Sequence, residues 1–83
     1  MTAGEAGAFI RARRKALGLT QNQVVAASGL SGQNYLSALE AGRYHIGHSK
    51  HLRRVAYVLR LTDAEIQAIN PELFVISNDQ GEG

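Results

Sequence analysis

Two short segments, Gly18-Leu19-Thr20-Gln21 and Ser31-Gly32-Gln33-Asn34, carry amide and hydroxyl side chains, and the second is rich in them. The amide of a glutamine or asparagine can form two hydrogen bonds with the edge of an adenine, which is a chemistry of recognition. Thr20 has the type and position of a helix cap, so Gln21 would stand at the positive end of a helix, where a phosphate is favoured.

Groups arranged for catalysis are missing from the sequence. It contains no nucleophile motif, no phosphate-cradling glycine loop and no pair of catalytic carboxylates. His45, His48 and His51 recur every three residues, but no Asp, Glu or Cys lies within that segment to complete a metal site. We therefore expect a protein that is not an enzyme and that binds no cofactor and no metal.

The periodicity of the apolar residues predicts five helices and no strands. The first helix is expected at about Glu5–Leu17, and Gly18 ends it. The second is expected at Gln21–Ser28, after which Gly29 can take a left-handed backbone and turn the chain. The third is expected at Gly32–Ala41, with Ser31 as its cap and Gly42 as its stop.

The last two predicted helices follow a loop. Ser49 is expected to cap a fourth helix that ends near Arg60. Thr62-Asp63-Ala64-Glu65 has the form of a capping box that opens a short fifth helix, which Pro71 limits. The residues expected to be buried in the first four helices are Phe9, Ile10, Leu17, Val24, Val25, Ala27, Leu36, Leu39, Leu52, Val55, Ala56 and Leu59.

Two short helices that meet at a glycine turn, the second rich in amides and hydroxyls, are the layout of a DNA-reading helix-turn-helix. Arg14–Gln21 and Glu40–Gly42 resemble the phage repressor and Cro (XRE) family, in which R-x-x-x-G-L-T-Q opens the motif and E-x-G closes it. The likeness runs over about Phe9–Ile69 and implies an all-α fold, a compact five-helix bundle of the lambda-repressor-like DNA-binding type. The expected division is a DNA-binding domain in residues 1–71, its motif at about residues 20–42, and a partly apolar, then flexible tail in residues 72–83.

The resemblance also implies roles for individual residues. It places the third helix, about residues 32–41, in the major groove, with base contacts from Gln33, Asn34, Ser37 and Ala38. It assigns phosphate contacts to the segments that flank the groove, through Gln21, Tyr35, Arg43, Tyr44 and Lys50. For each of these the alternative is an ordinary solvated position, and for Tyr35 it is a lid on the surface. Arg11 and Lys15 are expected to add only longer-range attraction.

Arg14 and Glu40 match a family pair that bridges the first helix to the end of the third. The resemblance therefore gives them a structural role, in which they hold the reading helix against the body. A part-buried bidentate pair of this kind orients well but adds little net stability over an apolar replacement. Loss of one partner is expected to cost about 2–4 kcal/mol, because the other charge is then desolvated and alone.

The chain departs from the family pattern at three places. Ser31-Gly32 looks like an insertion in the turn, Val25 stands where Ala or Gly is usual, and the loop after Gly42 is longer by one residue. The inserted residue leaves the register of the base contacts open. A rotation of the helix by up to about 100° would pass the reading role to Tyr35 and Ser37.

Charge is distributed unevenly along the chain. Residues 1–60 contain all nine lysines and arginines and two acidic residues, a net charge of +7, whereas residues 61–83 contain five acidic residues and no basic one. A basic body suits a polyanionic partner such as double-stranded DNA. The alternative is an ordinary solvated surface, with the acidic residues matched to the dipole of the last helix.

Length and composition indicate the number of domains and the cellular compartment of the protein. At 83 residues it suits one small domain, and without Cys it can form neither a disulfide nor a thiolate zinc site, which fits a reducing cytosol. No apolar run approaches the roughly 18 residues of a membrane span, and no charged-then-apolar leader begins the chain. We expect a cytoplasmic protein without a membrane partner.

The expected function is sequence-specific binding of double-stranded DNA by a transcriptional regulator, a repressor that acts as a homodimer. The run Leu73-Phe74-Val75-Ile76 favours an interface, with Leu73, Phe74 and Ile76 as dimer contacts; packing onto the body is the alternative. Two other interpretations stay open. The chain could be a protein-interaction module, such as an antitoxin or a transcriptional bridging factor with a further protein partner. It could also be the DNA-binding half of a longer regulator, with a missing C-terminal domain.

Overall fold

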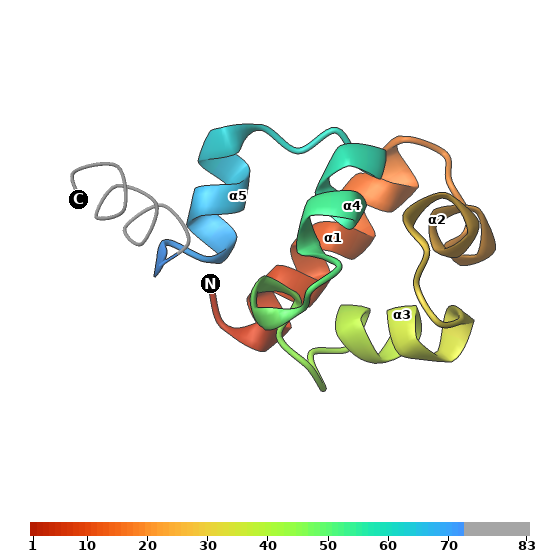
Figure 1. Cartoon of the computed structure of the whole chain (residues 1–83), viewed down its shortest axis with the longest axis horizontal. Coiled ribbons are helices and arrows are strands. Elements are labelled where there is room, and N and C mark those ends of the chain that lie inside the picture. Colours follow the sequence, from red (N-terminus) through yellow and green to blue (C-terminus); the bar gives the residue numbers. More distant parts are fainter. Residues whose placement is uncertain (73–83) are drawn as a thin grey trace.

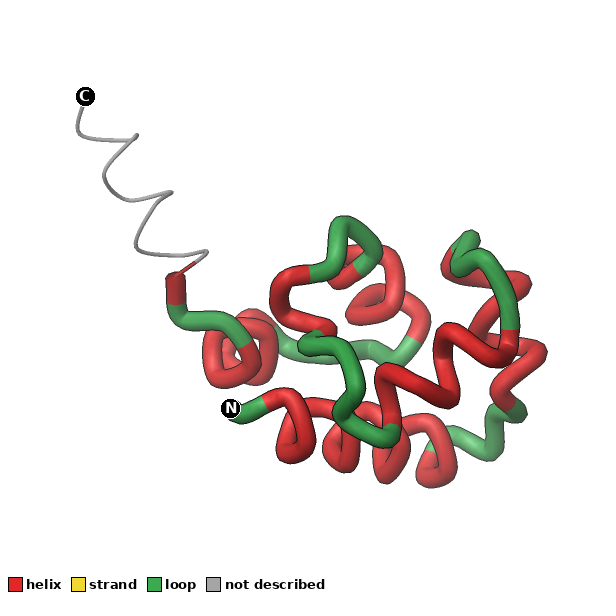
Figure 2. Tube along the Cα trace, turned by 90° about the horizontal axis from the view of Figure 1, so that it is seen from below, coloured by secondary structure: helices red, strands yellow, loops and turns green. Residues whose placement is uncertain are grey.

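The computed structural model describes residues 1–72, and the regular elements within them are all helical (Figures 1 and 2). The all-α, five-helix prediction is thereby confirmed. A 3-10 turn, η1, precedes the fourth helix. The elements are α1 at Ala3–Ala16, α2 at Gln21–Ser28, α3 at Gln33–Glu40, η1 at Ile46–His48, α4 at Leu52–Val58 and α5 at Asp63–Ile69.

Three helices begin with a capping box, in which a threonine hydroxyl and a side chain three residues later bond each other's backbone N–H. At α2, Gln23 N–H donates to Thr20 Oγ1 at 3.1 Å, and Thr20 N–H donates to Gln23 Oε1 at 2.8 Å. The box predicted at Thr62 and Glu65 is confirmed at α5. Helix α1 has a third box at Thr2, which lengthens it by two residues beyond the predicted start at Glu5.

The two predicted serine caps are wrong. Gly32, in extended backbone (φ 171°, ψ 172°), occupies the capping position of α3, so the extra turn residue displaces Ser31 from it. Ser49 is separated from α4 because η1 uses part of the loop and His51 takes the capping position; Ser49 Oγ accepts instead from His51 N–H at 3.1 Å. Helix α4 also ends at Val58, before the predicted end near Arg60.

The core is formed mainly by apolar residues from α1, α3 and α4, as their periodicity predicted. Ile10, Leu36 and Leu39 are fully buried. The apolar residues predicted to face inward from α4, Leu52, Val55 and Ala56, are buried as well. The prediction that Ala27 is buried is wrong, since Ala27 is exposed. Ser28 takes the inner position one turn after Val24, where its hydroxyl donates to the Val24 carbonyl at 2.6 Å. Phe9, Leu17 and Val25 are partly buried and pack against the core.

Gly7 allows α1 to lie directly against the C-terminal turn of α3. A Cβ atom at this position would stand 2.3 Å from the Leu39 carbonyl oxygen and 2.6 Å from that of Glu40. No real Cβ atom tolerates such distances to backbone, so the glycine fixes how closely the two helices approach.

The helices are arranged so that α2 and α3 stand together at one end of the described chain and α5 stands at the other (Figure 1). Helices α1 and α4 lie between them. Arg13 ties α5 to this centre: its Nη1 donates to the Leu59 and Arg60 carbonyls at 3.3 and 3.1 Å, and its Nη2 pairs with Glu65. Within residues 1–72, no helix has both the length and the apolar character needed to cross a membrane.

Candidate nucleic-acid interface

Helix α3 presents a polar face to solvent because its apolar residues point the other way. Leu36 and Leu39 are fully buried, and Gln33, Asn34 and Ser37 are exposed on the opposite side. The three polar side chains therefore share one accessible face of the helix. This arrangement follows the register in which the two amides lead the helix, despite the extra residue in the preceding turn.

A hydrogen-bonded layer of side chains connects this face to the start of α2. Gln21 Oε1 accepts from Gln33 Nε2 and from Ser37 Oγ, each at 3.1 Å. Gln21 Nε2 donates in turn to Glu40 Oε1 at 3.0 Å. The first residue of α2 thus holds two polar residues of α3 in place, and its own amide is oriented by the buried carboxylate.

That carboxylate belongs to an ion pair in the interior. Arg14 Nε and Nη2 donate to Glu40 Oε2 and Oε1 at 2.7 and 3.1 Å, and the side chains are only 10% and 5% exposed. Arg14 Nη1 also donates to the Leu19 carbonyl at 3.0 Å. Among the described side-chain nitrogen and oxygen atoms, none that is buried lacks a hydrogen-bond partner. The pair therefore joins α1 and the end of α3 to the segment that enters α2.

Tyr35 lies at the edge of α3 rather than on its exposed face. Its hydroxyl is 3.3 Å from Ser49 Oγ, and its ring centroid lies 5.9 Å from that of Tyr44 and 6.2 Å from that of His51. The side chain is half-buried and packs against the core. In this position Tyr35 covers the junction between α3 and the loop before α4, which corresponds to the lid considered from the sequence.

The basic loop after α3 borders the exposed face. A hollow is lined by Asn34, Ser37, Ala38, Ala41 and Arg43, so the half-buried Ala38 and the exposed Arg43 lie beside the two polar residues.

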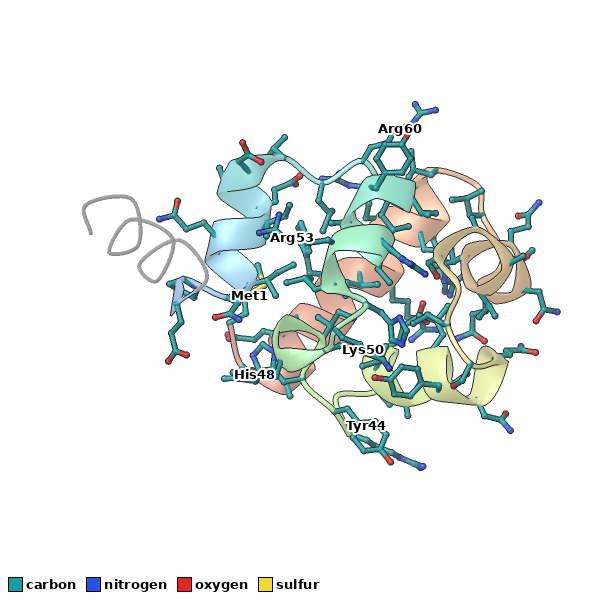
Figure 3. The ribbon with its side chains drawn as sticks, in the orientation of Figure 1. Met1, Tyr44, His48, Lys50, Arg53 and Arg60 are labelled. Carbon is teal, nitrogen blue, oxygen red and sulfur yellow. The ribbon has the colours of Figure 1, made fainter. Side chains whose placement is uncertain are left out.

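Further groups able to contact phosphates stand on both sides of α3. Tyr44 is 57% exposed and projects from the loop away from the helices, and the exposed Lys50 lies between η1 and α4 (Figure 3). On the other side, a second hollow brings Arg11 together with Gln21 and Ser37. The sequence had suggested only long-range attraction for Arg11. Its proximity to Gln21 depends on how α1 packs against α3, which no local pattern reveals.

The three histidines do not meet at one point. His45 Nδ1 accepts from Gly47 N–H at 3.0 Å, and its Nε2 is hydrogen-bonded to the Met1 carbonyl at 2.7 Å. The His48 ring packs edge-on against the His45 ring, with 4.8 Å between the two ring centroids, whereas the His51 ring lies against that of Tyr35. No cluster of three metal-ligating side chains occurs within residues 1–72. The predicted dimer contacts Leu73, Phe74 and Ile76 lie outside the described residues.

Comparison with known proteins agrees with this geometry. A family model described as a helix-turn-helix domain matches residues 5–69, a range that covers nearly all of α1 and the whole of α2 to α5. No curated protein and no solved structure matches the chain. From the extent of the family match, the chain belongs to the helix-turn-helix domain family, a family of DNA-binding domains.

Proposed function

We propose that this protein is a transcriptional regulator, a repressor of the phage repressor and Cro type, that binds double-stranded DNA sequence-specifically with α3 in the major groove. The single observation that carries the proposal is the exposed row of Gln33, Asn34 and Ser37, tied to the start of α2 through Gln21. Such a row matches the donor and acceptor pattern of base edges. The protein acts as a binding protein and not as an enzyme.

Preorganisation supports the reading role of α3. Because Gln21 Oε1 accepts from both Gln33 and Ser37, these two side chains have less rotational freedom to lose when they meet a base. Asn34 stands next to Gln33 and is exposed, so its amide can turn towards an adenine edge.

Phosphate contacts on both sides of α3 would position it in the groove. Arg43, Tyr44 and Lys50 stand on the loop side, while Arg11 stands on the side of the α2 start. Contacts of this kind fix orientation on the duplex and carry no base sequence. The net charge of +7 in residues 1–60 adds a general attraction to the duplex.

Two copies are proposed to bind a two-fold symmetric site. A single reading helix of 8 residues can contact only a few base pairs, so that a second copy lengthens the site. The two reading helices would then stand about 34 Å apart, which is one helical turn of DNA.

The test combines site selection with a salt titration. Selection from a random duplex pool should enrich a two-fold symmetric sequence. Binding of the labelled duplex should weaken linearly in log affinity against log salt, with a slope of several units. A scrambled duplex of the same length is the control. If no duplex binds at low salt, the proposal is wrong, and the use of this fold as a protein-interaction module, such as an antitoxin or bridging factor, takes its place.

A further inference from the structure

A second surface of the molecule has the character of a protein-docking site. We call it the α2–α4 groove; it is an open hollow of about 470 Å³, whose main lining residues are Ala26, Ala27, Arg53, Arg54, Tyr57 and Val58. Its volume falls within the range of about 300–1,000 Å³ that is typical of ligand-binding pockets. The groove therefore has room for large side chains of a partner to lie along it.

The composition of the groove departs from that of an ordinary solvated surface. Tyr57 is 86% exposed, although tyrosine usually buries much of its ring. Ala26 and Ala27 are also exposed, so that small apolar side chains line the α2 side of the groove together with Ser28 and Gly29. Tyrosine and arginine are among the residues enriched where proteins bind each other, particularly at the centre of the interface.

The groove carries positive charge without a compensating group. Arg53 and Arg54 are both exposed and line it, and no acidic residue does. The side-chain ion pairs of residues 1–72 involve Arg13 and Arg14 instead. An acidic segment with apolar side chains is therefore the occupant whose charge and polarity match this surface.

The groove is distinct from the amide row proposed to read bases. None of its lining residues lines the hollows beside α3, where Asn34, Ser37 and Gln21 lie, although Arg53 at its edge also lines a hollow with Lys50, a proposed phosphate contact. Occupation of the groove would thus leave the exposed amide row accessible, and one molecule could engage both partners at once.

The chain itself contains a segment with the required chemistry. Residues 72–83 include Glu72, Asp79 and Glu82, no lysine or arginine, and the apolar run Leu73-Phe74-Val75-Ile76. We propose that this C-terminal segment binds in the α2–α4 groove of a second copy, with Phe74 against Tyr57 and the small apolar side chains of α2. The inference rests on the two-fold dimer of the proposed function.

The two-fold dimer of the proposed function favours the groove of a second copy over that of the same chain. Figure 1 shows α5 and α2 at opposite ends of the described chain. The apolar run follows Glu72 directly, and four extended residues span only about 14 Å. In a two-fold dimer each copy supplies one segment and one groove, so that two identical contacts close the assembly.

Sedimentation equilibrium of the full chain tests the proposal with two variants. The groove variant carries Arg54→Glu and Tyr57→Ser, and the segment variant carries Phe74→Ser. Each should raise the dimer dissociation constant about tenfold or more, because a buried aromatic anchor is lost. Lys15→Glu, a charge reversal on the exposed side of α1, is the control and should leave dimerisation unchanged.

Mixing the two variants gives the decisive result. The groove variant keeps an intact segment and the segment variant keeps an intact groove, so the mixture should form a heterodimer more tightly than either variant dimerises alone. If both variants dimerise as tightly as wild type, or if the mixture associates no more tightly than each variant alone, the groove assignment is wrong and the proposed homodimer still stands. If the wild-type chain stays monomeric, both the groove assignment and the proposed homodimer are wrong. The DNA-binding proposal is then tested separately, by measuring whether the chain still binds a duplex at low salt.

Discussion

Arg14 and Glu40 form a bidentate ion pair, with Nε–Oε2 and Nη2–Oε1 distances of 2.7 and 3.1 Å, that joins α1 to the last residue of α3. The pair is almost inaccessible to solvent, with 10% and 5% exposure of the two side chains. Buried pairs of this type add little net stability, since desolvation offsets most of the attraction. Its effect is to fix where α3 stands on the body.

Removal of one partner of this pair should therefore be far more harmful than removal of both. We expect Glu40→Ala to lower the free energy of unfolding by about 3 kcal/mol, because Arg14 remains buried without its carboxylate. The double change Arg14→Met and Glu40→Leu should cost less than Glu40→Ala alone. Urea unfolding followed by circular dichroism measures both. Additive losses for the two sites would contradict this prediction.

Base reading and phosphate binding should separate when the residues of each surface are replaced. Gln33→Ala or Asn34→Ala should cost about 1–3 kcal/mol on the selected duplex and little on a scrambled one. Arg43→Ala or Lys50→Ala should weaken both duplexes alike and lower the salt slope by about one unit. Fluorescence anisotropy with the two duplexes measures these effects. Undiminished discrimination by both amide variants would mean that other residues of α3 read the bases.

The close approach of α1 and α3 should be sensitive to a single methyl group. Gly7→Ala places a Cβ atom 2.3 Å from the Leu39 carbonyl oxygen, so the helices must move apart, at a cost of about 1–3 kcal/mol. Gly4→Ala, in the same helix but with open space around it, is the matched control. Its effect should range from neutral to stabilising by about 1 kcal/mol. Equal melting temperatures for the two variants would show that α1 can shift without cost.

The start of α5 should confer a pH dependence on stability. The Thr62 N–H, followed by the Arg13 guanidinium, holds the pKa of Glu65 below its ordinary value of 4.5. Since this pKa is lower in the folded state, the ionised carboxylate stabilises the fold above about pH 4.5, and the contribution is lost as pH falls through the folded-state pKa.

Glu65→Gln isolates this charge because the amide oxygen can still accept from Thr62 N–H. We expect the variant to melt at a lower temperature than wild type near pH 7, with the difference shrinking as the pH falls below about 4.5. Glu5→Gln should behave with the same sign, since the Thr2 N–H lowers the pKa of Glu5 in the same way. A difference in melting temperature that stays constant down to about pH 3 would rule out the charge as its source.

The starts and ends of several helices could be predicted from the sequence because they depend on local hydrogen bonds. The cap predicted at Thr20 and the capping box predicted at Thr62 bond residues three apart, and the glycine after α2 takes the left-handed conformation expected of it (φ 74°). Such features need no partner elsewhere in the chain, so residue type and spacing suffice to predict them. At the start of α3, Ser31 had the preferred residue type for a cap, but the backbone of the turn placed Gly32 in the capping position.

Residue patterns by themselves thus determined the helices, the inward faces of α3 and α4, and the amides that lead α3. Packing alone decided the link from Gln33 through Gln21 to Glu40, the proximity of Arg11 to the start of α2, and the groove between α2 and α4. The physical reason is that these contacts join residues of different helices, and the two hydrogen bonds join residues 12 and 19 positions apart in the chain. Their distances depend on how closely whole helices approach, and at Gly7 that approach is set by the space of one missing methyl group.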